Sequence, residues 1–305
     1  MRRYHDHRNG AFAMDRPTDD VLKKIRDNMA GFSKGQRRIA QFMLEQYDKA
    51  AFLTAAKLGR TVGVSESTVV RFASELGYDG YPGMQRALQS LIRMRLTAAQ
   101  RVEVAADRIQ PDDVLTSVLE ADMENIRTSL SLIDKAEFDR VVHALLGARN
   151  IYIVGVRSAA ALAEFLSFYF KLILNNVQHV QTSTASELFE QIFRIDEQDV
   201  LIGISFPRYS KRTLKALNYA KSRNATVISV TDSAASPIAQ AADLSLIARS
   251  DMASFVDSLV APLSVINALI VAVSMQKEQE VVETFERLEQ IWDEYEVYEK
   301  MTTEK

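Results

Sequence analysis

The sequence predicts two domains of different class. An all-α N-terminal domain with a helix-turn-helix precedes a C-terminal α/β domain, whose parallel sheet carries helices on both faces. The length of 305 residues suggests two domains, at roughly 100–200 residues each. Up to about residue 95, apolar residues recur at helical spacing without strand-like alternation. After Gly147, short β-branched runs alternate with helical segments, which is typical of a parallel sheet with crossover helices.

Composition excludes several classes of protein. Hydrophobic residues make up 47% and charged residues 25%, as in ordinary globular proteins. The absence of cysteine excludes disulfides, thiolate metal sites and cysteine nucleophiles, and fits a reducing compartment. The polar first ten residues do not resemble a secretory signal, and the most apolar window, 261–275, is shorter than the roughly 20 residues of a membrane span. We therefore expect a cytoplasmic protein without a cofactor, a metal site or a membrane partner, in which 261–275 is a buried core helix.

Charge is distributed unevenly along the chain. The net charge is −3, yet residues 1–100 carry 17 Lys and Arg against 10 Asp and Glu. The remaining residues carry 20 against 30. A basic N-terminal part on an acidic body is typical of a polyanion-binding module joined to a domain with another task.

The N-terminal domain is expected over 18–96, after a disordered segment, 1–17. Thr18 and Ser33 are placed to cap the first two helices. Glycines at 63, 77 and 80 then separate short helices. A polar stretch with Pro111 near its end predicts a linker over 97–112.

The segment 54–77 has the pattern of a helix-turn-helix. Gly63 suits the tight turn because glycine adopts positive φ at little cost. Ser65 follows at an N-cap position, and Val69, Phe72 and Leu76 form the buried stripe of the next helix. A helix in this position presents its N-terminal residues to the major groove of duplex DNA.

The residues left outside that stripe are the candidate contacts with double-stranded operator DNA. Arg71 can bind a guanine through two hydrogen bonds, while the hydroxyls of the first turn can bind bases or phosphates. Nearby cations can neutralise phosphates. The hydroxyl candidates are Ser65, Ser67 and Thr68, and the cations are Lys57, Arg60, Arg37 and Arg38. The alternative is a helical hairpin stabilised by its glycine turn.

The C-terminal domain is expected over 113–300. Helices are predicted at 114–133 and 135–146, followed by five strands at 151–154, 177–180, 200–204, 226–230 and 244–248. The intervening helices are predicted at 159–174, 186–193, 209–222 and 236–241. An acidic helix over 278–300 carries Trp292, Tyr295 and Tyr298, and either packs on its own sheet or forms an interface.

The residues 51–88, with GVSESTVVRF and LGYDGYPGMQRAL, resemble the N-terminal domain of the RpiR (MurR/RpiR) family of transcriptional regulators. Residues 113–280 resemble the sugar isomerase (SIS) domain of that family, and RLEQIWDEYEVY at 287–298 is similar to its ending. The resemblance implies a sequence-specific DNA-binding regulator. It also implies an SIS-type sheet domain that binds a phosphosugar.

Two loops of the C-terminal domain are candidates for ligand binding. They are 155–159 and 205–213, and each follows a strand, where open α/β sheets bind ligands and helix N-termini attract anions. The candidate contacts are Arg157, Ser158, Ser205, Arg208 and Ser210, with Ser183 after the second strand as a further lining residue. Alternatively, Ser158 and Ser210 only cap helices. Asp232 is expected to organise its turn.

The second loop departs from the SIS pattern, which resembles S-x-S-G-x-T. Ser205 matches it and Ser210 replaces the threonine, but Pro207 stands for the middle serine and Arg208 for the glycine. Pro207 removes a hydroxyl and a backbone N–H from the anion cradle. Arg157 and Arg208 add positive charge, so we expect an anionic metabolite, either a phosphosugar or a sugar acid.

Two alternative functions remain. A phosphosugar isomerase would need a Glu or His base. His143 and His179 are expected on an outer helix and within a strand, away from the two loops, while Glu187 and Glu190 are conceivable bases. The other alternative is a DNA-binding protein whose second domain only dimerises. Helix-turn-helix proteins usually bind as dimers, so a homodimer or homotetramer is expected, with 261–275 and the aromatic tail as candidate interfaces.

Overall fold

The computed structural model describes residues 21–95, 113–181, 184–252 and 256–299. The chain divides into two compact units, residues 1–91 and 92–305, which are described separately. The N-terminal segment and the linker expected at 1–17 and 97–112 lie outside the described residues, as does Thr18.

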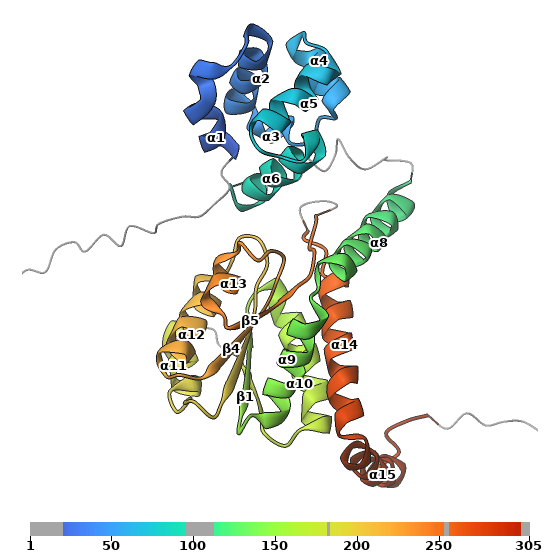
Figure 1. Ribbon diagram of the computed structural model, residues 1–305. Helices are drawn as coiled ribbons and strands as arrows, with labels where there is room; N and C mark the ends of the chain where they lie inside the picture. Colours follow the sequence, from blue (N-terminus) through green and yellow to red (C-terminus); the bar gives the residue numbers. More distant parts are fainter. Residues whose placement is uncertain (1–20, 96–112, 182–183, 253–255, 300–305) are drawn as a thin grey trace, which may run out of the picture. The chain divides into compact units, whose positions relative to one another are not determined.

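The first unit is all-α, as predicted. Its described part contains helices and no strand: α1 (Val21–Asn28), the short 3-10 helix η1 (Met29–Gly31), α2 (Lys34–Glu45), α3 (Tyr47–Ala50), α4 (Ala55–Val62), α5 (Glu66–Glu75) and α6 (Gly80–Arg95) (Figure 1). Ile39, Leu58 and Phe72 are fully buried in its core. Ser33 caps α2 in a capping box with Gln36, and Gln36 Nε2 donates to Glu75 Oε2 at 2.6 Å. This bond ties α2 to α5.

The second unit is an α/β domain around a five-stranded parallel sheet. Its elements are α8 (Val114–Leu132), α9 (Lys135–Gly147), β1 (Ile151–Gly155), α10 (Ser158–Ile173), β2 (Val177–Val180), α11 (Ala185–Ile192), β3 (Val200–Ile204), α12 (Lys211–Ser222), β4 (Thr226–Thr231), α13 (Pro237–Ala241), β5 (Leu244–Ile247), α14 (Val260–Gln276) and α15 (Glu278–Glu294). The strand order is β2-β1-β3-β4-β5. In the parallel register, Ile151 of β1 lies beside Val177 of β2 and Val200 of β3.

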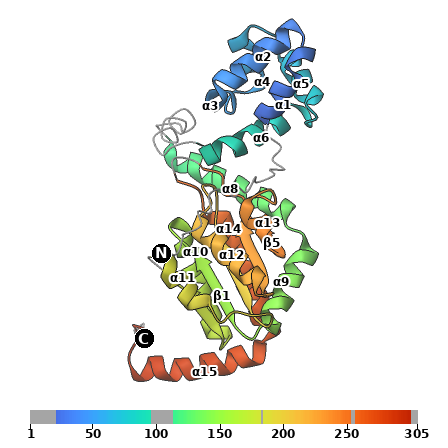
Figure 2. The same cartoon turned by 90° about the vertical axis from the view of Figure 1, so that its left-hand side faces the viewer.

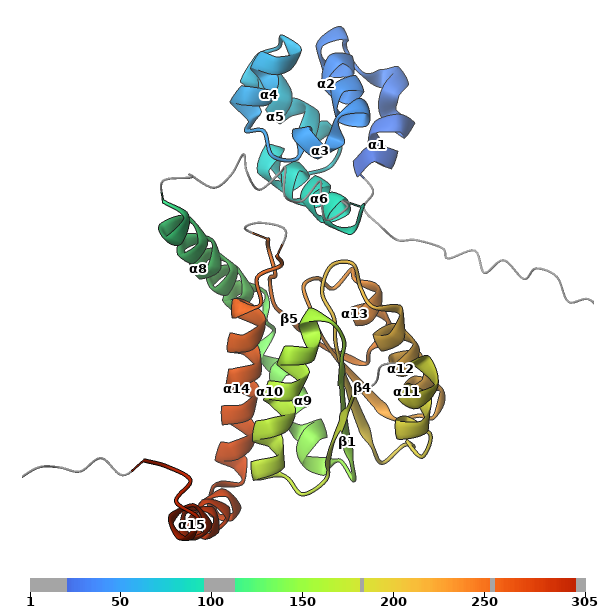
Figure 3. The same ribbon diagram turned by 180° about the vertical axis from the view of Figure 1, so that it is seen from behind.

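The sheet separates two hydrophobic layers. Ile151 and Ile153 belong to the core formed with α9, α10 and α14, whereas Tyr152 and Val154 belong to the core formed with α11, α12 and α13. Figures 1 and 3 show these helices on the two faces of the sheet. Both faces of β1 and β3 are buried because neighbouring side chains point to opposite layers. The predicted helix-covered parallel sheet is confirmed.

The two C-terminal helices differ in burial. The predicted core helix at 261–275 is confirmed as α14, which buries Val265, Leu269 and Val273 among others. None of the residues of α15 is buried, so the aromatic tail does not pack into the core of its own sheet domain (Figure 2). Among the described helices, no single one has the length and apolarity of a membrane span, and only α14 and α15 together reach them, across a 99° bend.

A polar clasp joins the N-terminal ends of β1 and β3, at the edge opposite the loops that follow these strands. Arg149 donates to Asp199 from Nε at 3.0 Å and from a terminal nitrogen at 2.6 Å. Asn150 Nδ2 and the Asp196 N–H each donate to the same carboxylate at 3.0 Å. Burial raises the pKa of Asp199, but the hydrogen bonds from Arg149, the Asp196 N–H and Asn150 outweigh it and hold the pKa below its usual value.

We expect Asp199→Asn to lower the free energy of unfolding by about 1–3 kcal/mol at neutral pH, because an ionised acceptor of several hydrogen bonds is lost. The pKa of Asp199 is lower in the folded than in the unfolded protein, where it is about 3.9. The contribution of the ionised Asp199 to the free energy of unfolding is therefore complete above about pH 5. It is lost as the pH falls below 4 and passes through the pKa of Asp199 in the folded protein. Urea unfolding between pH 3 and 7 measures the difference.

The control is Glu124→Gln, which breaks the Arg127–Glu124 pair, whose side chains are 74% and 64% exposed. Such a pair contributes at most about 1 kcal/mol. Equal losses in the two variants would contradict a special role for the clasp.

Candidate functional site

The turn between α4 and α5 is as tight as the sequence predicts. Gly63 has φ 72° and lies in the left-handed region, where glycine is favoured. Gly59, one turn earlier, allows a second close approach, since a Cβ there would lie 2.8 Å from the Val64 carbonyl oxygen. A larger residue at position 59 would therefore push α4 away from the turn.

Three hydroxyl groups gather at the N-terminus of α5. Ser65 is the N-cap, and its Oγ accepts from the Thr68 N–H at 3.3 Å. The same Oγ lies 2.9 Å from Ser67 Oγ and 2.8 Å from Thr68 Oγ1. The structure thus brings together the predicted hydroxyl contacts at a helix terminus whose dipole favours phosphate.

Four of the five predicted cations lie on the helix-turn-helix or against its turn, and one does not. Arg71 is exposed one turn into α5, and Lys57 and Arg60 are exposed on α4. Arg38 donates to the Gly63 carbonyl at 3.0 Å, which holds its guanidinium at the turn. Arg37 instead donates to the Ala30 carbonyl at 3.3 Å, outside the helix-turn-helix segment.

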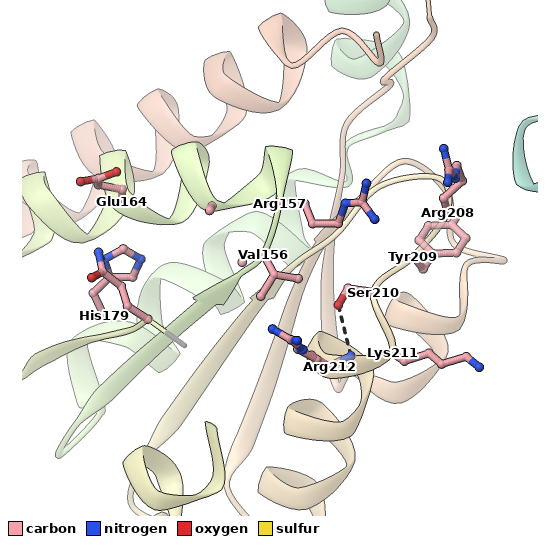
Figure 4. A pocket seen from close by; sticks show the side chains of 12 residues that line it. Val156, Arg157, Glu164, His179, Arg208, Tyr209, Ser210, Lys211 and Arg212 are labelled. Atoms are coloured by element: carbon pink, nitrogen blue, oxygen red, sulfur yellow. Dashed lines mark hydrogen bonds between the residues drawn. The ribbon is translucent and has the colours of Figure 1, made fainter. Parts of the chain in front are cut away.

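A cavity of about 610 Å³ opens in the second unit, at the carboxyl ends of β1 and β3 (Figure 4). Strand order reverses between these two strands, which is where a doubly wound sheet leaves a crevice for a ligand. We call this cavity the switch-point pocket. Its walls are the end of β1 with the start of α10, the edge strand β2, and the loop before α12: Gly155, Val156, Arg157, Ala160, Glu164, His179, Gln181, Arg208, Tyr209, Ser210, Lys211 and Arg212.

Three of the predicted ligand contacts, Arg157, Arg208 and Ser210, line this pocket. Ser205 is only 4% exposed and lies beneath the loop, where its Oγ accepts from the Ser210 N–H at 3.0 Å. Ser158 begins α10 but is not part of the lining, and Ser183 lies outside the described residues.

Of the two serines considered as helix caps, one has that role. Ser210 caps α12 by accepting from the Arg212 and Thr213 N–H groups at 3.1 and 3.3 Å. The cap position of α10 is occupied by Arg157 and not by Ser158. The sequence predicts that Asp232 organises its own turn after β4. In the structure its Oδ1 accepts from the Tyr209 hydroxyl at 2.8 Å, which ties this turn to the loop before α12.

Both arginines predicted to bind the ligand have unusual backbone conformations. Arg157 has φ 59° and ψ −128°, and Arg208 has φ 68°. These conformations favour glycine, and a larger residue in such a region costs about 1–3 kcal/mol. Residues that retain such strain cluster at functional sites, which supports a role for the two guanidinium groups at the pocket.

The polar groups of the pocket include several that the sequence did not reveal. Lys211 and Arg212 add two cations, and Glu164 adds a carboxylate from the second turn of α10. The expectation that His179 lies away from the loops is wrong. It stands on the edge strand β2, opposite Ile153 of β1, and that pairing brings it to the pocket wall.

The surroundings of His179 favour its uncharged form. Burial and the positive charge of Lys171 lower its pKa, and Glu164 only partly opposes them. Its Nδ1 lies 3.1 Å from Gln181 Nε2. His179 therefore supplies hydrogen bonding to the pocket without adding to its charge. Among the described residues, no cluster of three or more His, Asp or Glu is arranged to hold a metal ion.

Comparison with known proteins identifies both units. The family model described as a helix-turn-helix domain of the rpiR family matches residues 19–93, and the SIS domain model matches residues 144–272. An HTH-type transcriptional regulator of Caldanaerobacter subterraneus is 25% identical over 280 residues, covering 89% of this chain and 96% of that protein. The HTH-type transcriptional regulator HexR of Pseudomonas aeruginosa is 23% identical and covers 85% and 90%.

Solved structures share the fold. The sugar isomerase domain of an RpiR transcription factor from Sphaerobacter thermophilus has a TM-score of 0.56 and 24% identity, covering 58% of this chain and 99% of that one. The NanR protein of Vibrio vulnificus, solved as a complex with ManNAc-6P, has a TM-score of 0.52 and 22% identity, covering 89% and 99%.

Proposed function

Because this chain belongs to the RpiR family of helix-turn-helix transcriptional regulators and carries a C-terminal SIS domain, we propose that it couples operator binding to an anionic metabolite. Operator DNA binds to α4 and α5, and the metabolite, a phosphosugar or a sugar acid, binds in the switch-point pocket. The observation that carries the ligand part is the pocket itself, with Arg157 and Arg208 on strained backbone at its rim. The complex of the Vibrio vulnificus protein with ManNAc-6P supports a phosphorylated sugar.

The direct test uses purified full-length protein. Selection from a random duplex library yields its preferred DNA sequence, and operator affinity is then measured while hexose 6-phosphates and sugar acids are added. We expect one ligand class to change operator affinity by fivefold or more, which corresponds to a coupling energy of about 1 kcal/mol. Failure to select any sequence would contradict the DNA-binding part, and no response to either class would contradict the sensing part.

Arg71→Ala tests the reading of bases by α5. We expect it to weaken specific binding by about 1–3 kcal/mol and to relax preference at one base position, because an exposed arginine in this helix can bind guanine through two hydrogen bonds. Repeating the library selection with the variant measures both effects. Arg86→Ala removes an exposed arginine from α6 and should leave the preferred sequence unchanged. An unchanged preference in Arg71→Ala would remove this residue from the base-reading set.

A second copy of this chain is the partner proposed for the exposed side of α8. The residues that α8 buries are the polar Asn125 and Ser129. Asn125 exchanges hydrogen bonds with the backbone of Asp251, and Ser129 accepts from the Arg249 N–H at 2.8 Å. Most of its large apolar residues are exposed, and five of them share one face of the helix. We call these five the α8 stripe: Leu115, Leu119, Met123, Ile126 and Leu130.

The α8 stripe suits a symmetric dimer. Its members recur every three or four residues, so they form one continuous face of the helix, between 39% and 77% exposed. An apolar groove of about 410 Å³ continues the face between α8 and α14. A helix face of this kind can pack against its own copy across a two-fold axis, and a two-fold dimer matches the paired half-sites that helix-turn-helix proteins bind.

An isomerase activity is the second candidate, favoured by one observation. Glu164 and His179 lie on the same side of the switch-point pocket (Figure 4), and a carboxylate with a neutral imidazole can move a proton between adjacent carbons. The relatives named above are transcriptional regulators, which favours sensing over turnover. Incubation with hexose 6-phosphates in D₂O, followed by NMR, tests this candidate. Exchange of a carbon-bound proton would establish catalysis.

A further inference from the structure

The switch-point pocket carries more positive charge than one phosphate group neutralises. Four cationic side chains line it: Arg157, Arg208, Lys211 and Arg212. Among the described residues of the lining, Glu164 is the one acidic side chain, and His179 is neutral. Four cations against one carboxylate give a net charge of +3. A bound phosphate contributes only about −1.5 to −2 at neutral pH.

The protein itself does not neutralise these cations. Within the described part of the chain, none of the four forms an ion pair, whereas other arginines of the domain do, such as Arg149 with Asp199 and Arg249 with Asp251. All four side chains are exposed to solvent. Like charges gathered around one cavity repel one another. An oppositely charged molecule from solution removes that repulsion, and its total charge should approach −3.

The cations also stand on two different walls. Arg157 follows β1, whereas Arg212 lies in the first turn of α12, beside its cap Ser210 (Figure 4). The wall at α12 combines a helix N-terminus with a charged fork, which suits a phosphate. The wall at β1 offers the planar guanidinium of Arg157, which suits a carboxylate or a second phosphate.

We propose that the sensed metabolite is a sugar with two anionic groups, a phosphate held at the α12 wall and a second anion held by Arg157. The second anion is the carboxylate of a sugar acid or another phosphate. The inference rests on the proposed function, because it assumes that the switch-point pocket is the sensor. A phosphate of about −2 together with one carboxylate gives the ligand a charge of about −3, which would neutralise the net charge of +3 on the pocket lining.

The experiment is calorimetric titration of the full-length protein with matched probes. In each of the gluco, manno and galacto series, the probes are the hexose 6-phosphate, the aldonic acid 6-phosphate and the hexose 1,6-bisphosphate. In the series that binds, a two-anion probe should bind at least tenfold more tightly than the 6-phosphate. Whichever two-anion probe binds more tightly identifies the second anion as a carboxylate or a phosphate.

Two variants locate the second anion, and a third is the control. The two-anion probes are the aldonic acid 6-phosphate and the 1,6-bisphosphate. Arg157→Gln should lower their affinity to that of the 6-phosphate. The affinity of this variant for the 6-phosphate itself should change less than about threefold. Arg212→Gln should weaken both probes by a similar factor, about tenfold. Arg140→Gln, an exposed arginine on α9 outside the pocket, is the control and should change neither.

Equal affinities of one-anion and two-anion probes would overturn the inference while leaving the proposed sensor intact. The same holds if Arg157→Gln keeps the ratio of affinities found for the wild type. If no phosphorylated probe binds in any series, both the inference and the phosphosugar part of the proposed function are wrong.

Discussion

Arg157→Ala and Arg208→Ala proteins are expected to bind operator DNA as the wild type does and to lose their response to the metabolite. Each arginine supplies a charge-assisted contact of roughly 1.5–3 kcal/mol to an anion. The loss of either should therefore weaken ligand binding by one to two decades, since about 1.4 kcal/mol is tenfold. Both residues belong to the second unit, so the intrinsic fit of α5 to DNA should not change. Operator binding, titrated with the active ligand, measures the response.

Asn224→Ala is the matched control for the backbone. Asn224 also has positive φ, 62°, but lies after α12 and outside the switch-point pocket. It therefore tests an alanine substitution at another positive-φ position of the same domain without removing a cation from the pocket.

Because coupling between two binding sites is reciprocal, operator DNA should change ligand affinity by the same factor. A full ligand response in both arginine variants would refute the assignment of the pocket as the sensor.

The architecture of the second unit could be predicted because its signals are local. The runs IYIV and VLIGI are buried on both faces, and only a central parallel strand needs such continuous apolarity. The strand boundaries of β2 and β3 are those expected, and those of β1, β4 and β5 differ by one residue. In the first unit, Gly63 and Ser65 each have one conformational role, and the structure shows both of them as predicted.

The composition of the pocket could be predicted only in part because it depends on strand order. The sequence shows that loops follow β1 and β3, and so points to Arg157 and Arg208. It does not show that the edge strand β2 pairs with β1, which brings His179 to the same cavity. Glu164 lies two turns into α10, and no local signal separates it from an exposed helical carboxylate. Ser205 is a residue that the sequence did point to, because it matches the SIS motif, but it does not line the pocket. It supports the loop from beneath by accepting a hydrogen bond from the Ser210 N–H.

The sequence also could not predict which face of α8 is buried. An amphipathic helix normally turns its apolar stripe toward the core of its own domain. In α8 the buried positions are Asn125 and Ser129, because they satisfy the backbone of the segment that precedes α14. The stripe is therefore left outside, and this inversion is the strongest structural argument for a second copy of the chain.

Replacing Leu119 and Leu130 of the α8 stripe by Glu should separate the oligomer and lower affinity for a complete two-half-site operator by about 100-fold or more. The two leucines are 53% and 77% exposed, so the change should not affect folding. In the proposed dimer, however, it would bury unpaired carboxylates in an apolar interface. Joining two half-site contacts in one molecule raises affinity by 10²–10⁴-fold, and this gain is lost when the subunits separate. Affinity for a single half-site should remain unchanged. Light scattering and binding to one-half-site and two-half-site duplexes measure these effects.

Phe193→Glu is the control for this experiment. Phe193 is 55% exposed and follows α11 on the other face of the sheet, so it adds a charge to an exposed apolar site far from the stripe. This variant should keep the wild-type mass in solution and the wild-type preference for two half-sites. If the stripe variant also keeps both, the subunits meet elsewhere, and the exposed helix α15, with Val282, Ile291 and Tyr295, becomes the surface to test. If the stripe variant becomes monomeric but binds the complete operator as tightly as the wild type, operator recognition does not depend on pairing through α8.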